Sequence, residues 1–134
     1  MMKKWFMIGI PVVIICAIAW FVYAEINGNP YVKYQMDKEL PTHLETAGES
    51  KAATSMYLFA NPKFLINNDY YGDIYTLEFK DEPHMHYYYG LSKKDKKITQ
   101  FCEKDFDKDG VIDTITKETK HAEKSCVSMY ANRD

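Results

Sequence analysis

An uncharged run of nineteen residues lies close to the N-terminus: Trp5-Phe-Met-Ile-Gly-Ile-Pro-Val-Val-Ile-Ile-Cys-Ala-Ile-Ala-Trp-Phe-Val-Tyr23. At roughly 1.5 Å per residue, a helix of this length spans about 28 Å, close to the hydrocarbon thickness of a bilayer. Lys3 and Lys4 precede the run, and aromatic residues lie at both of its ends. These flanks predict a single-pass helix in the cell membrane, with the short N-terminus in the cytoplasm and the rest of the chain outside.

Two interpretations of this run are open. An uncleaved signal anchor is favoured because the apolar core of a secretory signal peptide usually has only about 7 to 15 residues. The alternative is a signal peptide cleaved after Ala24, where small residues loosely meet the pattern of a cleavage site, and the protein would then be secreted. Cys16 follows the bulky Ile15, unlike the cysteine of a lipid-attachment site, and is interpreted as an ordinary membrane-facing residue.

Residues 1–24 are assigned to the anchor and residues 25–134 to one extracytoplasmic domain, because a chain of this length suffices for one small core and not for two. The whole chain carries 17 basic and 19 acidic residues, and two of the lysines belong to the anchor, so the domain is net acidic. The absence of a basic stripe that could neutralise phosphates argues against a nucleic-acid partner. Eleven tyrosines indicate a folded, strand-rich body.

The pattern of apolar residues changes along the domain from helical to strand-like. After the breaker Asn27-Gly-Asn-Pro30, apolar residues mostly four apart predict an amphipathic helix that begins at Tyr31, is kinked or split by Pro41 and is capped by Gly48. Alternating apolar residues then predict strands joined by short turns at 56–60, 74–79, 84–91 and 98–101. The predicted fold is α+β: a transmembrane helix, then an amphipathic helix packed on one face of a small antiparallel sheet.

Several short motifs in this part of the chain resemble a known family. They are Asn27-Gly-Asn-Pro30 before a helix that bears lysine and glutamate, Phe79-Lys-Asp-Glu-Pro83, Tyr87-Tyr-Tyr89 and Lys93-Lys-Asp-Lys-Lys-Ile-Thr-Gln100. In these features residues 1 to about 101 resemble the DUF3139 family and its YfjL-like relatives. The resemblance implies a small membrane-anchored or secreted protein of Gram-positive bacteria, with a helix-plus-sheet body, no assigned activity and no catalytic residues to transfer. The segment from Cys102 onward departs from the family pattern.

An aspartate-rich stretch in that segment, Asp105-Phe-Asp-Lys-Asp-Gly-Val-Ile-Asp113, matches the D-x-D-x-D-G-x-x-D pattern of calcium loops. The predicted ligands are the carboxylates of Asp105, Asp107, Asp109 and Asp113 and the carbonyl oxygen of Val111. Thr116 stands where an EF-hand has its bidentate glutamate, so the stretch resembles the shorter calcium loops of FG-GAP and thrombospondin type 3 repeats. We predict a structural Ca²⁺ ion here, and the alternative is a plain β-hairpin with its turn at Lys108-Asp-Gly110.

Two cysteines flank this stretch, Cys102 and Cys126, and they are the only cysteines outside the apolar run. Because disulfides form and persist in oxidising compartments, we predict that they are paired, and two free thiols are the alternative. Residues 102–126 are therefore interpreted as a C-terminal calcium-loop extension of the domain.

Two further groups of residues could bind a ligand. His84 and His86 lie on one face of a predicted strand, a spacing that zinc or copper can use. Two ligands do not complete a site, and His43 and His121 would join them only by a tertiary coincidence, so exposed strand histidines are the favoured interpretation. The stretch Tyr87-Tyr-Tyr89 could stack on sugars or peptides, although packing within the protein is favoured.

Neither G-x-S-x-G nor H-E-x-x-H occurs in the sequence, so no motif for nucleophilic or zinc-dependent hydrolysis is present. We therefore predict a non-catalytic, membrane-tethered extracytoplasmic module, stabilised by calcium, that contacts an envelope protein or a cell-wall partner. The alternative is a cell-envelope enzyme, a hydrolase or a transferase, on the outer face of the membrane.

Overall fold

The computed structural model describes the backbone of residues 2–49, 53–60 and 66–133, and the side chains of residues 8–49 and 66–133. The described elements are the helices α1 (Met2–Asn27) and α2 (Pro30–Ala47) and the strands β1 (Ala53–Ala60), β2 (Tyr70–Phe79), β3 (Glu82–Ser92), β4 (Ile98–Lys108) and β5 (Val111–Ile115). The strands form one sheet in sequence order, and every neighbouring pair is antiparallel. The predicted α+β fold, with its antiparallel sheet, is confirmed.

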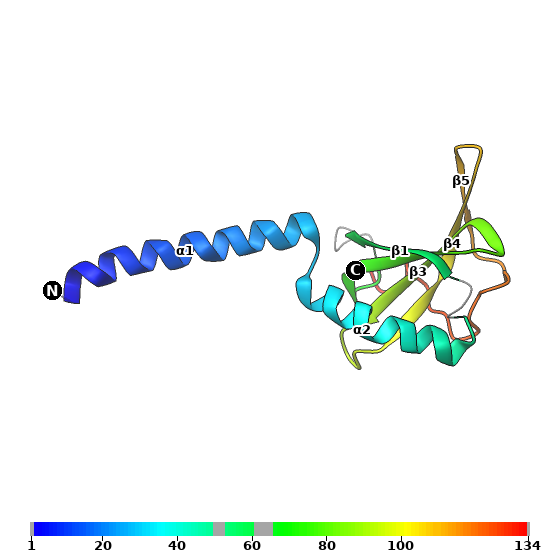
Figure 1. Ribbon diagram of the computed structural model, residues 1–134, viewed down its shortest axis with the longest axis horizontal. Coiled ribbons are helices and arrows are strands. Elements are labelled where there is room, and N and C mark those ends of the chain that lie inside the picture. Colours follow the sequence, from blue (N-terminus) through cyan, green and yellow to red (C-terminus); the bar gives the residue numbers. More distant parts are fainter. Residues whose placement is uncertain (1, 50–52, 61–65, 134) are drawn as a thin grey trace.

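α1 is a long apolar helix that extends away from the rest of the molecule (Figure 1). Its stretch Ile8–Asn27 has a mean hydropathy of 2.1, and none of it is buried inside the protein. By length and composition this helix could cross a membrane or serve as a signal sequence. It ends at Asn27, the first residue of the predicted breaker.

α2 is an amphipathic helix with a cap at each end, of which the C-terminal one at Gly48 was predicted. The side chain of Asn29 caps its N-terminus by accepting a hydrogen bond from the backbone N–H of Tyr31 at 3.0 Å. Gly48 caps its C-terminus in the left-handed conformation, with a φ of 81°. Contrary to one expectation, Pro41 does not split the helix. This residue lies on the exposed side, where water can take the place of the hydrogen bond that a proline cannot donate.

The main core lies between α2 and one face of the sheet. The helix buries Val32, Met36, Leu40 and Leu44. The strands contribute Tyr75, Leu77, Phe79, Met85, Tyr87, Tyr89 and Leu91. These strand residues alternate along β2 and β3, as predicted, because successive side chains of a strand point to opposite faces of a sheet. Tyr87 and Tyr89 have no exposed surface, so packing within the protein is the correct interpretation of these two tyrosines.

The opposite face of the sheet is also covered, which we did not predict from the sequence. A second cluster of buried side chains contains Ile66, Tyr70, Ile74, Phe101 and Met129. Met129 belongs to the C-terminal segment (residues 116–133), an irregular stretch that returns along β4 and forms a parallel bridge between Val127 and Phe101. The sheet therefore lies between α2 on one side and part of the C-terminal segment on the other.

Candidate functional site

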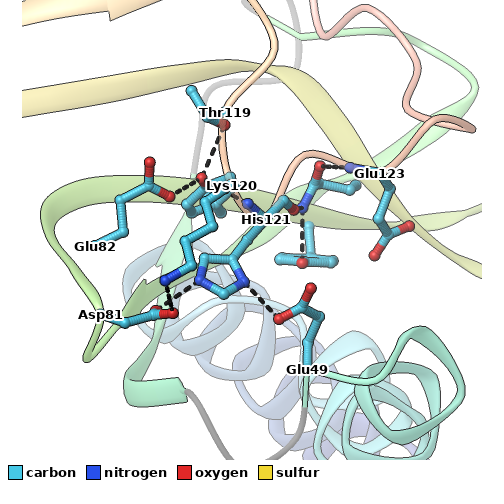
Figure 2. A network of polar contacts seen from close by, with 10 residues as sticks. Glu49, Asp81, Glu82, Thr119, Lys120, His121 and Glu123 are labelled. Carbon is cyan, nitrogen blue, oxygen red and sulfur yellow. Dashed lines mark hydrogen bonds and ion pairs between the residues drawn. The ribbon is translucent and has the colours of Figure 1, made fainter.

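A buried histidine, His121, lies at the centre of a polar network formed with the C-terminal segment (Figure 2). Its side chain is 5% exposed, and its ring stacks on the ring of Phe79 with 4.0 Å between centroids. Nδ1 lies 2.5 Å from Oε2 of Glu49, and Nε2 lies 2.7 Å from Oδ1 of Asp81. Both ring nitrogens can donate to these carboxylates together only when the imidazole is protonated. We call His121, Glu49 and Asp81 the histidine clamp.

Three separate parts of the chain form the histidine clamp. Glu49 follows Gly48, where the left-handed cap ends α2 and turns the chain toward the sheet. Asp81 lies in the two-residue turn that joins β2 to β3. His121 comes from the C-terminal segment, which has no regular structure there. The histidine clamp thus ties a helix end, a hairpin turn and the last part of the chain together.

Asp81 is shared between two cationic side chains. Lys120 forms an ion pair with its Oδ2, while His121 contacts its Oδ1. Hydrogen bonds from Lys120 and then from His121 lower the pKa of Asp81 to about 2. The Asp81 carboxylate therefore carries its negative charge near neutral pH.

Beside the histidine, the hydroxyl of Tyr87 is held by two neighbours. It donates to the carboxylate of Glu82 and lies 2.8 Å from Oγ1 of Thr119. The backbone N–H of His121 donates to the same hydroxyl at 3.3 Å. Burial, reinforced by the hydrogen bond to Glu82, raises the pKa of Tyr87, so the phenol stays protonated. This core tyrosine therefore adds a further attachment point for the C-terminal segment.

A buried amide, that of Gln100 on β4, fastens the same segment from the sheet. Its Nε2 lies 2.8 Å from the hydroxyl of Tyr89 and 2.9 Å from the carbonyl oxygen of His121, and it donates to both. Its Oε1 accepts the backbone N–H of Glu123 at 2.8 Å. Glu123 in turn contacts His43 on α2, with 2.8 Å between Oε1 and Nε2. The amide is fully satisfied, so its burial does not carry the penalty of an unpaired polar group.

The network holds the C-terminal segment in place. Both ring nitrogens of His121 lie within hydrogen-bond distance of carboxylates. Throughout the part of the chain that the structure describes, every buried side-chain nitrogen and oxygen has a hydrogen-bond partner. This geometry is that of a structural fastening.

The aspartate-rich stretch forms a two-stranded β-hairpin, which was the alternative to a calcium loop. β4 runs on to Lys108, well beyond the predicted strand 98–101, and β5 begins at Val111. The two residues between them, Asp109 and Gly110, have positive φ values of 58° and 77°. Two successive positive φ values are typical of a type I′ turn, which joins antiparallel strands directly.

In this hairpin the predicted calcium ligands do not converge. Asp105 and Asp107 lie on one face of β4, whereas Asp113 pairs with Phe106 and lies on the other face. Asp105 is also engaged by the hydroxyl of Tyr88, which donates to it at 2.6 Å. No group of three or more His, Cys, Asp or Glu side chains among the described residues is placed to hold a metal ion. The observed arrangement does not fit a calcium site, and calcium binding stays a prediction.

The predicted disulfide is present. Cys102 on β4 and Cys126 in the C-terminal segment are joined, with 5.0 Å between their Cα atoms. The backbone N–H of Cys102 also donates to the carbonyl oxygen of Val127 at 2.9 Å. The disulfide therefore fixes the C-terminal segment to the strand beside it.

The histidines do not gather at one place. His86 lies 3.5 Å from Glu78, on the face of the sheet opposite the main core. His43 lies against the buried ring of Tyr89, and His121 lies in the histidine clamp, both on the side of α2. The sheet separates His86 from His43 and His121, because alternate side chains of a strand point to opposite faces.

We did not predict the histidine clamp from the sequence. In the sequence His121 stands out only as a histidine that could join a metal site by a tertiary coincidence, since no local spacing connects it to Glu49 or Asp81. The one feature of the sequence that indicates where His121 lies is the predicted disulfide. It requires the chain after Cys102 to return to the sheet, and it places His121 five residues before Cys126.

Comparison with known proteins supports the resemblance drawn from the motifs. No curated protein and no solved structure matches the chain. A family model, described as Protein of unknown function (DUF3139), matches residues 2–89. The matched region runs from α1 through most of β3 and contains Glu49 and Asp81, whereas His121 and the disulfide lie beyond it. Because this match covers more than half of the chain, the protein belongs to the DUF3139 family.

Proposed function

We propose that this protein is a non-catalytic, membrane-tethered module whose domain lies outside the cytoplasmic membrane and contacts an envelope protein or a cell-wall partner. The observation that carries the proposal is the contrast between α1 and the domain. Most of the described side chains of α1 are apolar and almost all are exposed, whereas the domain buries apolar residues on both faces of its sheet. Burial of so much apolar surface in a bilayer is strongly favourable.

Two features support placing the domain outside. Lys3 and Lys4 precede the apolar run, and positive charges favour the cytoplasmic side. Cys102 and Cys126 form a disulfide, which persists in an oxidising compartment. The free cysteine, Cys16, lies within α1 and is not available to that pair.

Site-directed thiol labelling on intact cells tests the topology. We expect a membrane-impermeant maleimide to label Lys117→Cys, an exposed position of the C-terminal segment, without permeabilisation. The matched control, Met2→Cys, should react only after the membrane is opened. The reverse pattern would place the domain in the cytoplasm and contradict the proposal.

Chemical cross-linking of intact cells tests the partner. The full chain, purified after cross-linking, should carry a discrete adduct that a variant truncated after Asn29 lacks, because the domain supplies the contact surface.

The non-catalytic part of the proposal is tested on the purified chain. Turnover of peptidoglycan or a peptide, abolished by a single carboxylate substitution, would replace it with the envelope-enzyme alternative.

A further inference from the structure

One end of the domain lies next to the end of α1. The link between α1 and α2 is only two residues, Gly28 and Asn29, and the backbone N–H of Asn29 donates to Oδ2 of Asp73 on β2 at 2.6 Å. Because an extended chain advances at most about 3.6 Å per residue, α2 begins within about 11 Å of the end of α1. The end of the sheet where β2 begins is therefore held beside the point at which α1 ends.

The turn between β3 and β4 reaches the same end of the domain (Figure 1). We call this turn, residues 93–97, the basic turn; it consists of Lys93, Lys94, Asp95, Lys96 and Lys97, all exposed. Nζ of Lys96 donates to the hydroxyl of Tyr71 at 2.7 Å and lies 4.9 Å from the centroid of its ring. That ring is 6.0 Å from the ring of Tyr31 in the first turn of α2. Direct contacts thus connect the basic turn to the start of α2.

The basic turn and the opposite end of β4 differ in charge. The basic turn has four lysines and one aspartate, and neither Lys94 nor Lys97 forms a salt bridge with any described residue. The β4–β5 hairpin at the other end of the strand, residues 105–115, carries four aspartates and one lysine. A negatively charged surface would therefore attract the basic turn and repel the hairpin.

We propose that the basic turn, together with Tyr31 and Tyr34 of α2, rests on the anionic headgroups of the bilayer that holds α1. This inference rests on the proposed function, because it requires α1 to lie in a membrane. The side chains of Tyr31 and Tyr34 are 43% and 63% exposed, and tyrosine is enriched at the headgroup layer. Each lysine close to an anionic membrane strengthens binding about fivefold, over a range of about 8 Å at physiological ionic strength.

This contact would give the domain one orientation on the membrane. The two-residue link already attaches the domain to the end of α1. Binding of the basic turn to the headgroups adds a second attachment point. The acidic hairpin then lies at the end of the domain far from the bilayer, where a partner in the envelope can reach it (Figure 1).

Amine reactivity of the full chain in nanodiscs tests the inference. We would compare discs of phosphatidylcholine with discs that also contain phosphatidylglycerol, and measure acetylation by acetic anhydride, an uncharged reagent, by mass spectrometry. Lys94 and Lys97 should react about fivefold more slowly in the anionic discs, and high salt should remove the difference. Lys117 and Lys124, exposed residues of the C-terminal segment, are internal controls and should react equally in both discs.

A triple variant removes three of the four lysine charges of the basic turn and leaves Lys96 as the residue whose acetylation is measured. In Lys93→Gln/Lys94→Gln/Lys97→Gln, the slower acetylation of Lys96 in anionic discs should be lost, whereas the matched variant Lys117→Gln/Lys124→Gln should retain it. A chain that incorporates into the discs yet shows equal acetylation of the basic turn in both lipids overturns this inference alone. A chain that does not incorporate into either disc overturns the proposed function as well.

Discussion

Replacing His121 by alanine tests whether the histidine clamp holds the C-terminal segment on the sheet. The substitution removes the contact to Glu49 at 2.5 Å, the contact to Asp81 at 2.7 Å and the stacking on Phe79. A hydrogen bond to a charged group contributes about 1.5 to 3 kcal/mol, and we use the lower value for Glu49, whose side chain is 22% exposed. The stacked, buried ring adds about 1 kcal/mol. We add no separate value for the contact to Asp81, because solvent screens it and Lys120 still pairs with this carboxylate after the substitution, so the expected loss is about 2.5 kcal/mol.

Urea unfolding of the full chain in detergent micelles measures this loss, with the near-ultraviolet circular dichroism of the tyrosines as the signal. The free energy of unfolding should fall by about 2.5 kcal/mol in His121→Ala, which corresponds to a melting temperature roughly 10 °C lower for a domain of this size. Loosening of the C-terminal segment should also accelerate cleavage by trypsin at the lysines of that segment, Lys117, Lys120 and Lys124.

His86→Ala is the matched control, because His86 makes one longer contact, 3.5 Å, to Glu78 on the other face of the sheet. We expect this control to lower the free energy of unfolding by less than about 1 kcal/mol. Combining His121→Ala with Glu49→Gln should cost less than the sum of the two single losses, since each removes the same contact. Full additivity, or a loss no larger than that of the control, would refute the reasoning.

Three further predictions concern Asp81, the disulfide and the aspartate-rich stretch. Because the folded-state pKa of Asp81 is lowered from 3.8 to about 2, its share of the stability is present above pH 3.8 and is lost as the pH falls toward 2. Asp81→Asn, compared with Asp109→Asn at the hairpin tip, should therefore flatten the pH dependence of urea unfolding in that window. Replacing both Cys102 and Cys126 by serine should lower the free energy of unfolding by about 3.5 kcal/mol in the chain-entropy estimate, and an unchanged urea midpoint would contradict the disulfide's role. If the aspartate-rich stretch binds calcium, saturating calcium should raise the melting temperature by several degrees, and Asp107→Ala should abolish the rise. Equal melting temperatures in calcium and in EDTA would mean that the stretch is a plain hairpin.

The features that could be predicted from the sequence are those that leave a local periodic signal. Residues four apart, such as Val32 and Met36, form the buried face of α2, and alternating residues, such as Leu77 and Phe79, form the buried face of the sheet. These patterns arise because a helix repeats every 3.6 residues and a strand every two. The C-terminal helix cap at Gly48 follows from equally local backbone chemistry.

The features that could not be predicted depend on contacts between distant residues. His121 and Glu49 are 72 residues apart in the chain, and no spacing rule connects them. The covering of the second sheet face depends likewise on Met129, which reaches the sheet only because the C-terminal segment folds back. The hairpin shows a different limit: Asp109-Gly110 is the preferred pair for a type I′ turn and also part of a calcium-loop pattern, so the same residues suit both structures.

The most direct test of membrane tethering is the intact mass of the protein recovered from the membrane fraction of cells that express it. We predict the full chain of 134 residues and 15.7 kDa, with α1 retained. Recovery from the medium of a shorter protein that begins at Glu25 would show that α1 is a cleaved signal sequence and would contradict the proposed tether.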